Sequence, residues 1–280
     1  MSAKADVQLH DFTNIFSLSG KVAVVSGGSR GLGLHAASGL LQAGCSKVFI
    51  TSRKAKACEE AVAALNALPT QGKAYSVPAD SSKIEEIERL VKEVGKETDH
   101  VDILFANAGA TWGAAFDETE EKNGWNRVMD LNVKGVFFTI QKFAPLLEKR
   151  ATTENPSKVI VTGSVAGIMV GSLGANASFS YAASKAAVLH LARNLAVELG
   201  PRHILVNGIA PGFFPSKMAN GLMEMAGGVE TLAKQSPNGK VGQPEDVAAA
   251  VVYLSSRGAN HVNGDTIVLD GGKIWGQAKL

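Results

Sequence analysis

Tyr181 and Lys185 form the most informative pair of residues in this chain of 280 residues. They are four positions apart in the stretch Ser180-Tyr181-Ala182-Ala183-Ser184-Lys185, so a helix would place both side chains on one face. A tyrosine ordinarily keeps its proton until about pH 10, and a nearby lysine cation favours the phenolate. We therefore expect a lowered pKa at Tyr181 and proton transfer near neutral pH. An amphipathic helix with a surface lysine has the same spacing, so the pair needs support from the rest of the chain.

A glycine-rich turn in the first third of the chain gives this support. The apolar run Lys21 to Ser26 predicts a buried strand, and Leu34 to Ala43 has the composition and spacing of a helix. Gly27-Gly28-Ser29-Arg30-Gly31-Leu32-Gly33 connects the two. Glycines let the backbone approach a ligand closely, and the N–H groups and dipole of a helix start attract an anion. The context favours a phosphate-binding turn over a plain glycine-rich turn.

Further strand candidates alternate with helical segments along the chain. They are Lys47–Thr51, Lys73–Val77, Asp102–Ala106, Lys158–Thr162, His203–Ile209 and Asp265–Leu269. The alternation predicts an α/β fold, a single doubly wound (Rossmann) domain with a mostly parallel seven-stranded sheet and helices on both faces. We place this domain at residues 18–272, between an N-terminal extension (1–17) and a C-terminal tail (273–280). Ligands of such sheets bind at the carboxyl ends of the strands.

The residues at those ends resemble the motifs of the short-chain dehydrogenase/reductase family, across roughly residues 18–272. The glycine turn looks like the family's T-G-x-x-x-G-x-G, with Ser26 in place of the threonine, and Asn107-Ala108-Gly109 looks like its N-A-G. The catalytic tetrad of the family corresponds in order to Asn132, Ser164, Tyr181 and Lys185.

Two departures accompany this resemblance. Ala106 stands where many members have an asparagine, and the gap between Ser164 and Tyr181 is longer than usual. The longer gap leaves Ser178 and Ser180 as alternatives to Ser164.

The resemblance implies a role for each member of the tetrad. Tyr181 would donate a proton to a substrate carbonyl, and Lys185 would lower the pKa of Tyr181 and hold the nicotinamide ribose. Ser164 would hydrogen-bond the carbonyl oxygen, and Asn132 would support a water chain that replenishes the proton. The carbonyl oxygen gains negative charge as hydride arrives, so preplaced donors stabilise the transition state more than the ground state.

The expected cofactor is NADP. In related sheets an acidic residue about twenty positions after the glycines binds the ribose hydroxyls, whereas an arginine accepts a 2′-phosphate. This chain has Ser52-Arg53-Lys54 there and no acid before Glu59; the alternative is that these cations only begin a solvated helix. The implied cofactor-binding residues are Gly27, Ser29, Arg30, Gly31, Leu32, Gly33, Ser52, Arg53, Lys54, Asp80, Ser81, Asn107, Ala108, Gly109, Tyr181, Lys185, Pro211, Gly212, Phe214 and Ser216.

A hydrophobic carbonyl substrate is expected from the second half of the chain. The stretch between Pro211 and Pro244 is long for a plain connection and is interpreted as a substrate lid or as core. Its apolar residues include Phe213, Phe214, Met218, Leu222, Met223 and Met225, and Trp112, Met169 and Leu173 are expected to complete the pocket. In the runs 111–115, 124–133 and 210–218 the chain looks most like the family's 3-oxoacyl reductases associated with rhamnolipid synthesis, and this resemblance favours 3-oxoacyl thioesters. Alternatives are a polyketide-type ketoreductase and a cofactor-sensing protein without turnover.

Composition excludes several other classes of protein. The apolar content of 45%, the charged content of 19% and a net charge of +2 predict a large core with no nucleic-acid partner. No apolar run is long enough to span a membrane, and Met1 to Asn14 resembles no secretory signal or transit peptide. The two cysteines indicate a reducing compartment, and the spacing of the histidines predicts no metal site.

Ala278-Lys279-Leu280, at the end of the sequence, is a variant of the peroxisomal S-K-L address. It predicts an import receptor as partner; without import, the expected location is the cytoplasm. The family resemblance also implies a homotetramer.

Overall fold

The computed structural model describes residues 7, 9–171, 173–215 and 227–276. Several predicted residues lie outside these ranges. They are Ser216, the lid residues Met218, Leu222, Met223 and Met225, and the terminal Ala278-Lys279-Leu280.

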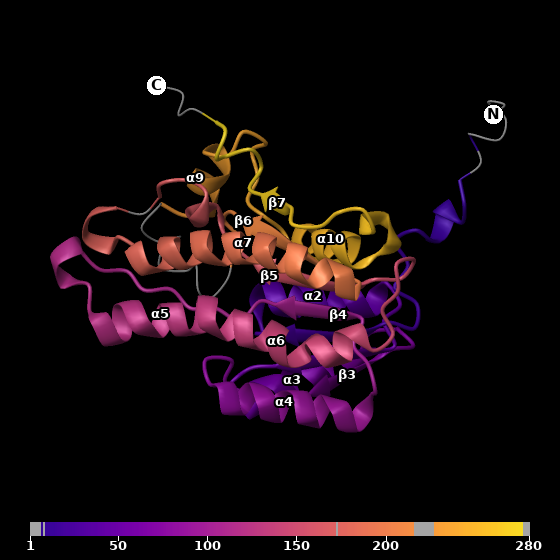
Figure 1. Cartoon of the computed structure of the whole chain (residues 1–280). Coiled ribbons are helices and arrows are strands. Elements are labelled where there is room, and N and C mark those ends of the chain that lie inside the picture. The colour runs from indigo at the N-terminus through magenta and orange to yellow at the C-terminus, as the bar shows by residue number, and fades with distance from the viewer. Residues whose placement is uncertain (1–6, 8, 172, 216–226, 277–280) are drawn as a thin grey trace.

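Seven parallel strands form a single central sheet in the order β3-β2-β1-β4-β5-β6-β7 (Figure 1). The strands are β1 (Val22–Ser26), β2 (Lys47–Thr51), β3 (Lys73–Ser76), β4 (Ile103–Ala106), β5 (Ser157–Thr162), β6 (Ile204–Pro211) and β7 (Thr266–Leu269). Each predicted strand is present, with ends that match or differ by one or two residues. All six strand pairs are parallel, which confirms the predicted fold class.

Helices cover both faces of the sheet. They are α2 (Gly31–Gln42), α3 (Ala55–Asn66), α4 (Ile84–Glu97), α5 (Arg127–Met129), α6 (Gly135–Glu148), α7 (Phe179–Leu199), α9 (Val229–Lys234) and α10 (Pro244–Ser255). One core cluster buries side chains of α2, α3 and α10, and a second buries side chains of α4, α6 and α7. Figure 1 shows α4, α6 and α7 together on the near face. Alternate residues of β1 serve the two clusters, because successive side chains of a strand point to opposite faces: Ala23 and Val25 lie in the first, Val22 and Val24 in the second.

The chain reverses its winding direction between β1 and β4. After β1 it crosses the first face through α2 to β2, and after β4 it crosses the second face through α6 to β5. The loops that follow β1 and β4 therefore separate at the carboxyl edge of the sheet. Such a switch point is where ligands bind in doubly wound sheets.

None of the described helices has both the length and the apolar character needed to cross a bilayer. In the same residues, no three His, Cys, Asp or Glu side chains gather closely enough to hold a metal ion.

Candidate active site

The glycine turn after β1 packs directly against the loop after β4. Gly27 has a φ of 66°, a conformation that favours glycine. A Cβ added at Gly33 would collide with the Gly27 carbonyl oxygen and would lie 2.6 Å from Asn107 Nδ2. Only glycine therefore lets the first turn of α2 come this close to the two loops.

Ser26 joins these loops, a role that its position in the glycine motif did not by itself predict. Its hydroxyl oxygen accepts hydrogen bonds from the backbone N–H groups of Asn107 and Ala108, both at 3.0 Å. Asn107 Nδ2 donates to the Ser26 carbonyl oxygen at 3.1 Å, and Asn107 Oδ1 accepts from Thr162 Oγ1 at 3.1 Å. The family position of Ser26 was the signal that could have identified this role.

The residues near the turn fit a dinucleotide phosphate. No side chain caps the start of α2, so N–H groups of its first turn are free to bind an anion. Arg30, the residue before α2, has an extended backbone and an exposed side chain. The fit rests on this uncapped helix start together with the close backbone approach at Gly33.

A hollow of about 330 Å³ lies beyond the ends of β2 and β3. It is lined by Arg53, Pro78, Ala79, Asp80, Lys83, Glu85, Glu86 and Arg89. Glu86 pairs with Arg89 at 2.7 Å, whereas Arg53 forms no ion pair with any described residue. A free guanidinium beside a hollow of this size suits an adenosine that carries a 2′-phosphate.

The other predicted cofactor residues at the strand ends differ in their burial and in their hydrogen-bond partners. The Ser52 hydroxyl lies 3.1 Å from Cys58 Sγ, and one Asp80 carboxylate oxygen accepts hydrogen bonds from the N–H and hydroxyl of Ser82. Ser81 is buried. The Phe214 ring packs in the core against Gly242, which leaves its backbone to contact a cofactor, and the predicted role of Phe214 in cofactor binding stays a prediction. Pro211 and Gly212 end β6 beside β7.

Helix α7 carries Tyr181 and Lys185 on one side, as the spacing predicted. Lys185 Nζ donates to the Thr162 carbonyl oxygen at 2.7 Å and lies 5.6 Å from the centroid of the Tyr181 ring. Burial lowers the pKa of Lys185 to about 8. Burial also raises the pKa of Tyr181, and the hydrogen bond with the Ser164 hydroxyl lowers it by less. The predicted lowering of the Tyr181 pKa is therefore wrong for the protein alone, because burial outweighs the favourable interactions.

The structure selects among the three candidate serines. Ser164 follows β5, accepts a hydrogen bond from the Ala166 N–H at 3.2 Å and also hydrogen-bonds Tyr181. Ser180 is buried and donates to the Gly124 carbonyl oxygen, while Ser178 only precedes α7. Ser164 is therefore the serine that the fold brings to the Tyr181 hydroxyl.

Asn132 lies in a short π-helical segment, η4 (Asp130–Lys134), and is buried. Its Oδ1 accepts from the Ala110 N–H at 2.8 Å, and its Nδ2 donates to the Ala110 carbonyl and to Ser184 Oγ, both at 2.9 Å. A Cβ added at Gly109 would lie 3.3 Å from Asn132 Oδ1 and 3.5 Å from Lys185 Nζ. Asn132 thus fixes the loop after β4 next to Lys185; its predicted role in a water chain stays a prediction.

The predicted apolar pocket has a different form. The Trp112 ring packs against Gly124, where an added Cβ would lie 2.9 Å from two ring atoms. Met169 and Leu173 are exposed, together with Ile168 and Val170. The structure therefore separates Trp112, which serves packing, from an open apolar segment between β5 and α7.

Comparison with known proteins adds the family context. Residues 27–273 match the family described as enoyl-(acyl carrier protein) reductase. A Pseudomonas aeruginosa rhamnolipids biosynthesis 3-oxoacyl-(acyl-carrier-protein) reductase is 43% identical over 257 residues, which cover 92% of this chain and 97% of the relative. An Escherichia coli 5-keto-D-gluconate 5-reductase is 34% identical, over 93% of this chain and 98% of the relative.

Solved structures that are similar to this chain include two complexes with NADP. The Pseudomonas aeruginosa RhlG/NADP active-site complex has a TM-score of 0.85 and 42% identity, over 95% of this chain and 99% of that chain. A Burkholderia cenocepacia gluconate 5-dehydrogenase in complex with NADP and tartrate has a TM-score of 0.83 and 28% identity, over 94% of this chain and 99% of that chain.

Proposed function

Because this chain belongs to the short-chain dehydrogenase/reductase family, we propose that it reduces 3-oxoacyl thioesters or related hydrophobic ketones to secondary alcohols with NADPH. The chain is an NADP-dependent oxidoreductase. Its relatives include both a 3-oxoacyl reductase and a ketogluconate reductase, so the substrate must be argued from this chain's own residues.

The segment between Ser164 and Tyr181 favours an apolar substrate. No charged residue occurs between Lys158 and Lys185 in the sequence. The apolar side chains of Ile168, Met169, Val170 and Leu173 are exposed there, between Ser164 and Tyr181 in the chain. A ketogluconate would need cations for its carboxylate and polar groups for its hydroxyls, and this segment offers no cation. Binding of an acyl chain over this segment is favourable, because it removes exposed apolar surface from water.

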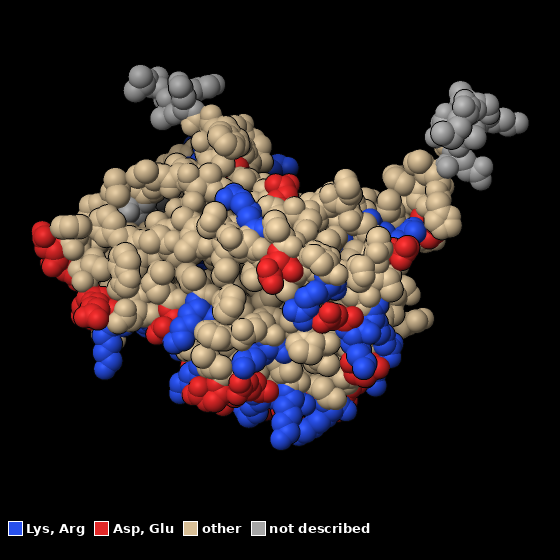
Figure 2. Space-filling view, in the orientation of Figure 1, with Lys and Arg blue, Asp and Glu red and all other residues tan. Residues whose placement is uncertain are grey.

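The surface over α7 is also consistent with an apolar substrate. Figure 2 shows charged side chains gathered over α4, whereas the surface over α7 is mostly uncharged. An apolar substrate reaching the site from this side meets little charge that would have to be desolvated.

In the proposed mechanism, bound NADPH supplies the hydride. Ser164 and Tyr181 donate hydrogen bonds to the carbonyl oxygen, and Tyr181 gives up its proton as that oxygen becomes an alkoxide. Lys185, with a pKa of about 8, is mostly charged at neutral pH and stabilises the phenolate left on Tyr181. Asn132 holds the loop after β4 in place beside Lys185.

The test is a steady-state assay that follows NADPH absorbance. Substrates are 3-oxoacyl-CoA esters of several lengths, simple hydrophobic ketones and 5-ketogluconate, with NADH as the cofactor control. We expect the largest kcat/KM for the thioesters with NADPH. Turnover of 5-ketogluconate alone would refute the acyl assignment, and turnover of unrelated ketones alone would replace it with a ketoreductase of another substrate class.

A matched pair of variants tests the apolar segment itself. Val170 and Val197 are 77% and 79% exposed, so changing either to serine should leave the fold unaffected. We expect Val170→Ser to raise the KM for a long-chain thioester several-fold. Contact between one exposed valine and the acyl chain contributes about 1 kcal/mol of binding free energy, and the serine loses this contribution. Val197→Ser, near the far end of α7, should change nothing. Equal KM values for both variants would remove this segment from the substrate site.

Three further predictions from the sequence also stay predictions. They are the domain limits at residues 18–272, the homotetramer and peroxisomal import through Ala278-Lys279-Leu280. Light scattering of the purified protein measures the assembly state. Imaging of the intact chain beside a Leu280→Asp variant tests the import signal.

A further inference from the structure

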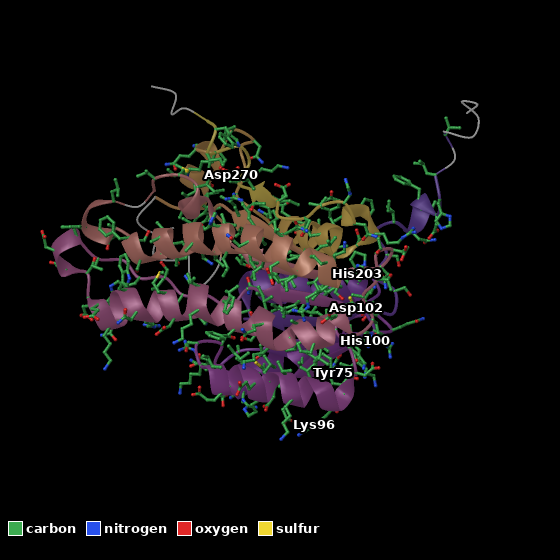
Figure 3. All side chains as sticks on the ribbon, viewed as in Figure 1. Tyr75, Lys96, His100, Asp102, His203 and Asp270 are labelled. Carbon is green, nitrogen blue, oxygen red and sulfur yellow. The ribbon has the colours of Figure 1, made fainter. Side chains whose placement is uncertain are left out.

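A small polar cavity lies at the amino ends of the strands, away from the active site. Its accessible volume is about 20 Å³. The lining residues precede β1 and β4, begin β5, end α10 and continue into η8 (Arg257–Ala259). Figure 3 places Asp102, which precedes β4, far from Asp270, which follows β7 at the opposite edge of the sheet. The cavity is therefore independent of the site that holds Tyr181.

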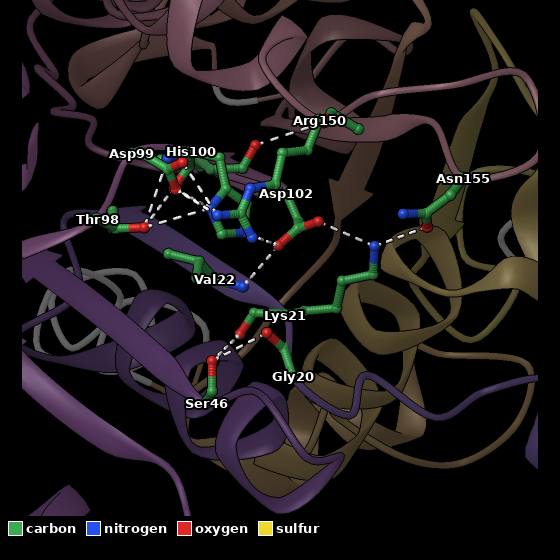
Figure 4. Close-up of polar contacts among 12 residues, drawn as sticks. Gly20, Lys21, Val22, Ser46, Thr98, Asp99, His100, Asp102, Arg150 and Asn155 are labelled. Carbon is green, nitrogen blue, oxygen red and sulfur yellow. Dashed lines mark hydrogen bonds and ion pairs between the residues drawn. The ribbon is translucent and has the colours of Figure 1, made fainter.

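The charges in the cavity wall do not balance. Lys21 pairs with Asp102, the only acidic residue of the lining, at 2.9 Å and also donates to Asn155 (Figure 4). Arg257 pairs with Asp11 at 3.0 Å. Lys158 has no carboxylate within 4.0 Å among the described residues.

Lys158 is nevertheless 3% exposed. Its Nζ donates to Asn260 Oδ1 at 2.8 Å and to the Ala259 carbonyl oxygen at 3.3 Å. An ammonium has three N–H groups, so one remains without a described acceptor. Burial and, to a smaller extent, the positive charge of Lys21 together lower the pKa of Lys158 to about 8. Lys158 is still mostly charged at neutral pH, and an uncompensated buried charge is strongly unfavourable.

A second donor lines the same cavity. Ser255 is 3% exposed, and its hydroxyl has no hydrogen-bond partner among the described residues. The neighbouring Ser256 differs, because its hydroxyl donates to the Tyr253 carbonyl oxygen at 2.7 Å. Lys158 and Ser255 thus each bring a donor to a cavity whose wall carries excess positive charge.

We propose that this cavity binds a small monovalent anion of the halide class, chloride in ordinary buffers, between Lys158 and Ser255. The anion accepts hydrogen bonds from both donors and compensates the buried charge. A volume near 20 Å³ holds about one water-sized ligand, which excludes phosphate and carboxylates. A water molecule would satisfy the donors but not the charge. The anion links β5 to the end of α10, so its effect is on stability.

Thermal unfolding of the full chain tests the proposal. Sodium chloride replaces sodium gluconate stepwise at constant ionic strength and neutral pH, because a ligand of the folded state raises Tm as its concentration passes Kd. We expect a saturable rise of Tm with chloride, a several-fold weaker apparent affinity in Ser255→Ala, and no chloride response in Lys158→Met. The control is Ser157→Ala, a buried serine whose hydroxyl donates to the Leu147 carbonyl at 2.6 Å; its chloride response should equal that of the wild type.

A crystal grown in sodium bromide gives a second measurement that does not depend on how the variants fold. The expected result is an anomalous bromide peak within hydrogen-bond distance of Lys158 Nζ and Ser255 Oγ. The proposal is overturned if water alone occupies this position. It is also overturned if chloride and gluconate give the same Tm, or if Ser255→Ala keeps the wild-type response. None of these readouts involves turnover, so the result is separate from the proposed activity.

Discussion

Replacement of Ser26 by alanine tests how the glycine turn is attached to the rest of the site. Ser26 is 3% exposed, and its hydroxyl accepts the backbone N–H groups of Asn107 and Ala108 at 3.0 Å. Removing the oxygen leaves both N–H groups without an acceptor. Each unsatisfied buried donor costs about 1–3 kcal/mol, and since these two are only partly buried the lower end applies to each. Ser26→Ala should therefore lose about 2 kcal/mol of the free energy of unfolding.

The cofactor site should respond to the same change. Asn107 Nδ2 donates to the Ser26 carbonyl oxygen, and Gly33 is packed against both Gly27 and Asn107. A loosened loop after β4 allows the phosphate-binding turn to move, so the Kd for NADPH should rise several-fold.

Urea unfolding and NADPH fluorescence titration measure the two effects. The control is Ser26→Thr, which restores the residue of the family motif, keeps the hydroxyl acceptor and should stay within about 1 kcal/mol of the wild type. The reasoning is refuted if Ser26→Ala unfolds within about 0.5 kcal/mol of the wild type with an unchanged Kd. It is equally refuted if Ser26→Thr is as damaged as Ser26→Ala.

Three further predictions concern charge and proton transfer. Arg53→Glu should raise the KM for NADPH at least about tenfold while NADH is little affected, since only NADPH carries the 2′-phosphate; steady-state kinetics with both cofactors measure this, and equal effects would contradict it. Tyr181→Phe should abolish turnover and leave NADPH binding nearly intact, and substantial residual activity would remove Tyr181 as the proton donor. The pKa of Lys158 is about 8 in the folded protein against an ordinary 10.5, so the folded state loses this proton first as pH rises. In chloride-free buffer the wild type should therefore gain about 3 kcal/mol of unfolding free energy relative to Lys158→Met between pH 8 and 10.5; urea unfolding along this pH series measures it, and a constant difference would argue against a charged, buried Lys158.

Local patterns in the sequence were sufficient to predict the fold class and the general type of reaction. Short apolar runs and the glycine turn identify strands and helix starts, because strand burial and tight turns depend on neighbouring residues. The four-residue spacing of Tyr181 and Lys185 is likewise a local property of a helix. The parallel sheet and the common side of this pair could therefore be predicted before any tertiary contact was known.

Contacts between distant residues were decided only by the tertiary structure. Ser26 meets Asn107 across 81 positions because β1 and β4 are neighbours in the sheet. The same packing brings Lys185 to the Thr162 carbonyl, selects Ser164 over Ser180 and buries Tyr181 enough to raise its pKa. Strand order, register and burial are properties of the whole domain, and desolvation can reverse a pKa shift expected from spacing alone. The sequence thus determined which groups could react, and the tertiary structure decided which partners each group meets and how strongly each holds its proton.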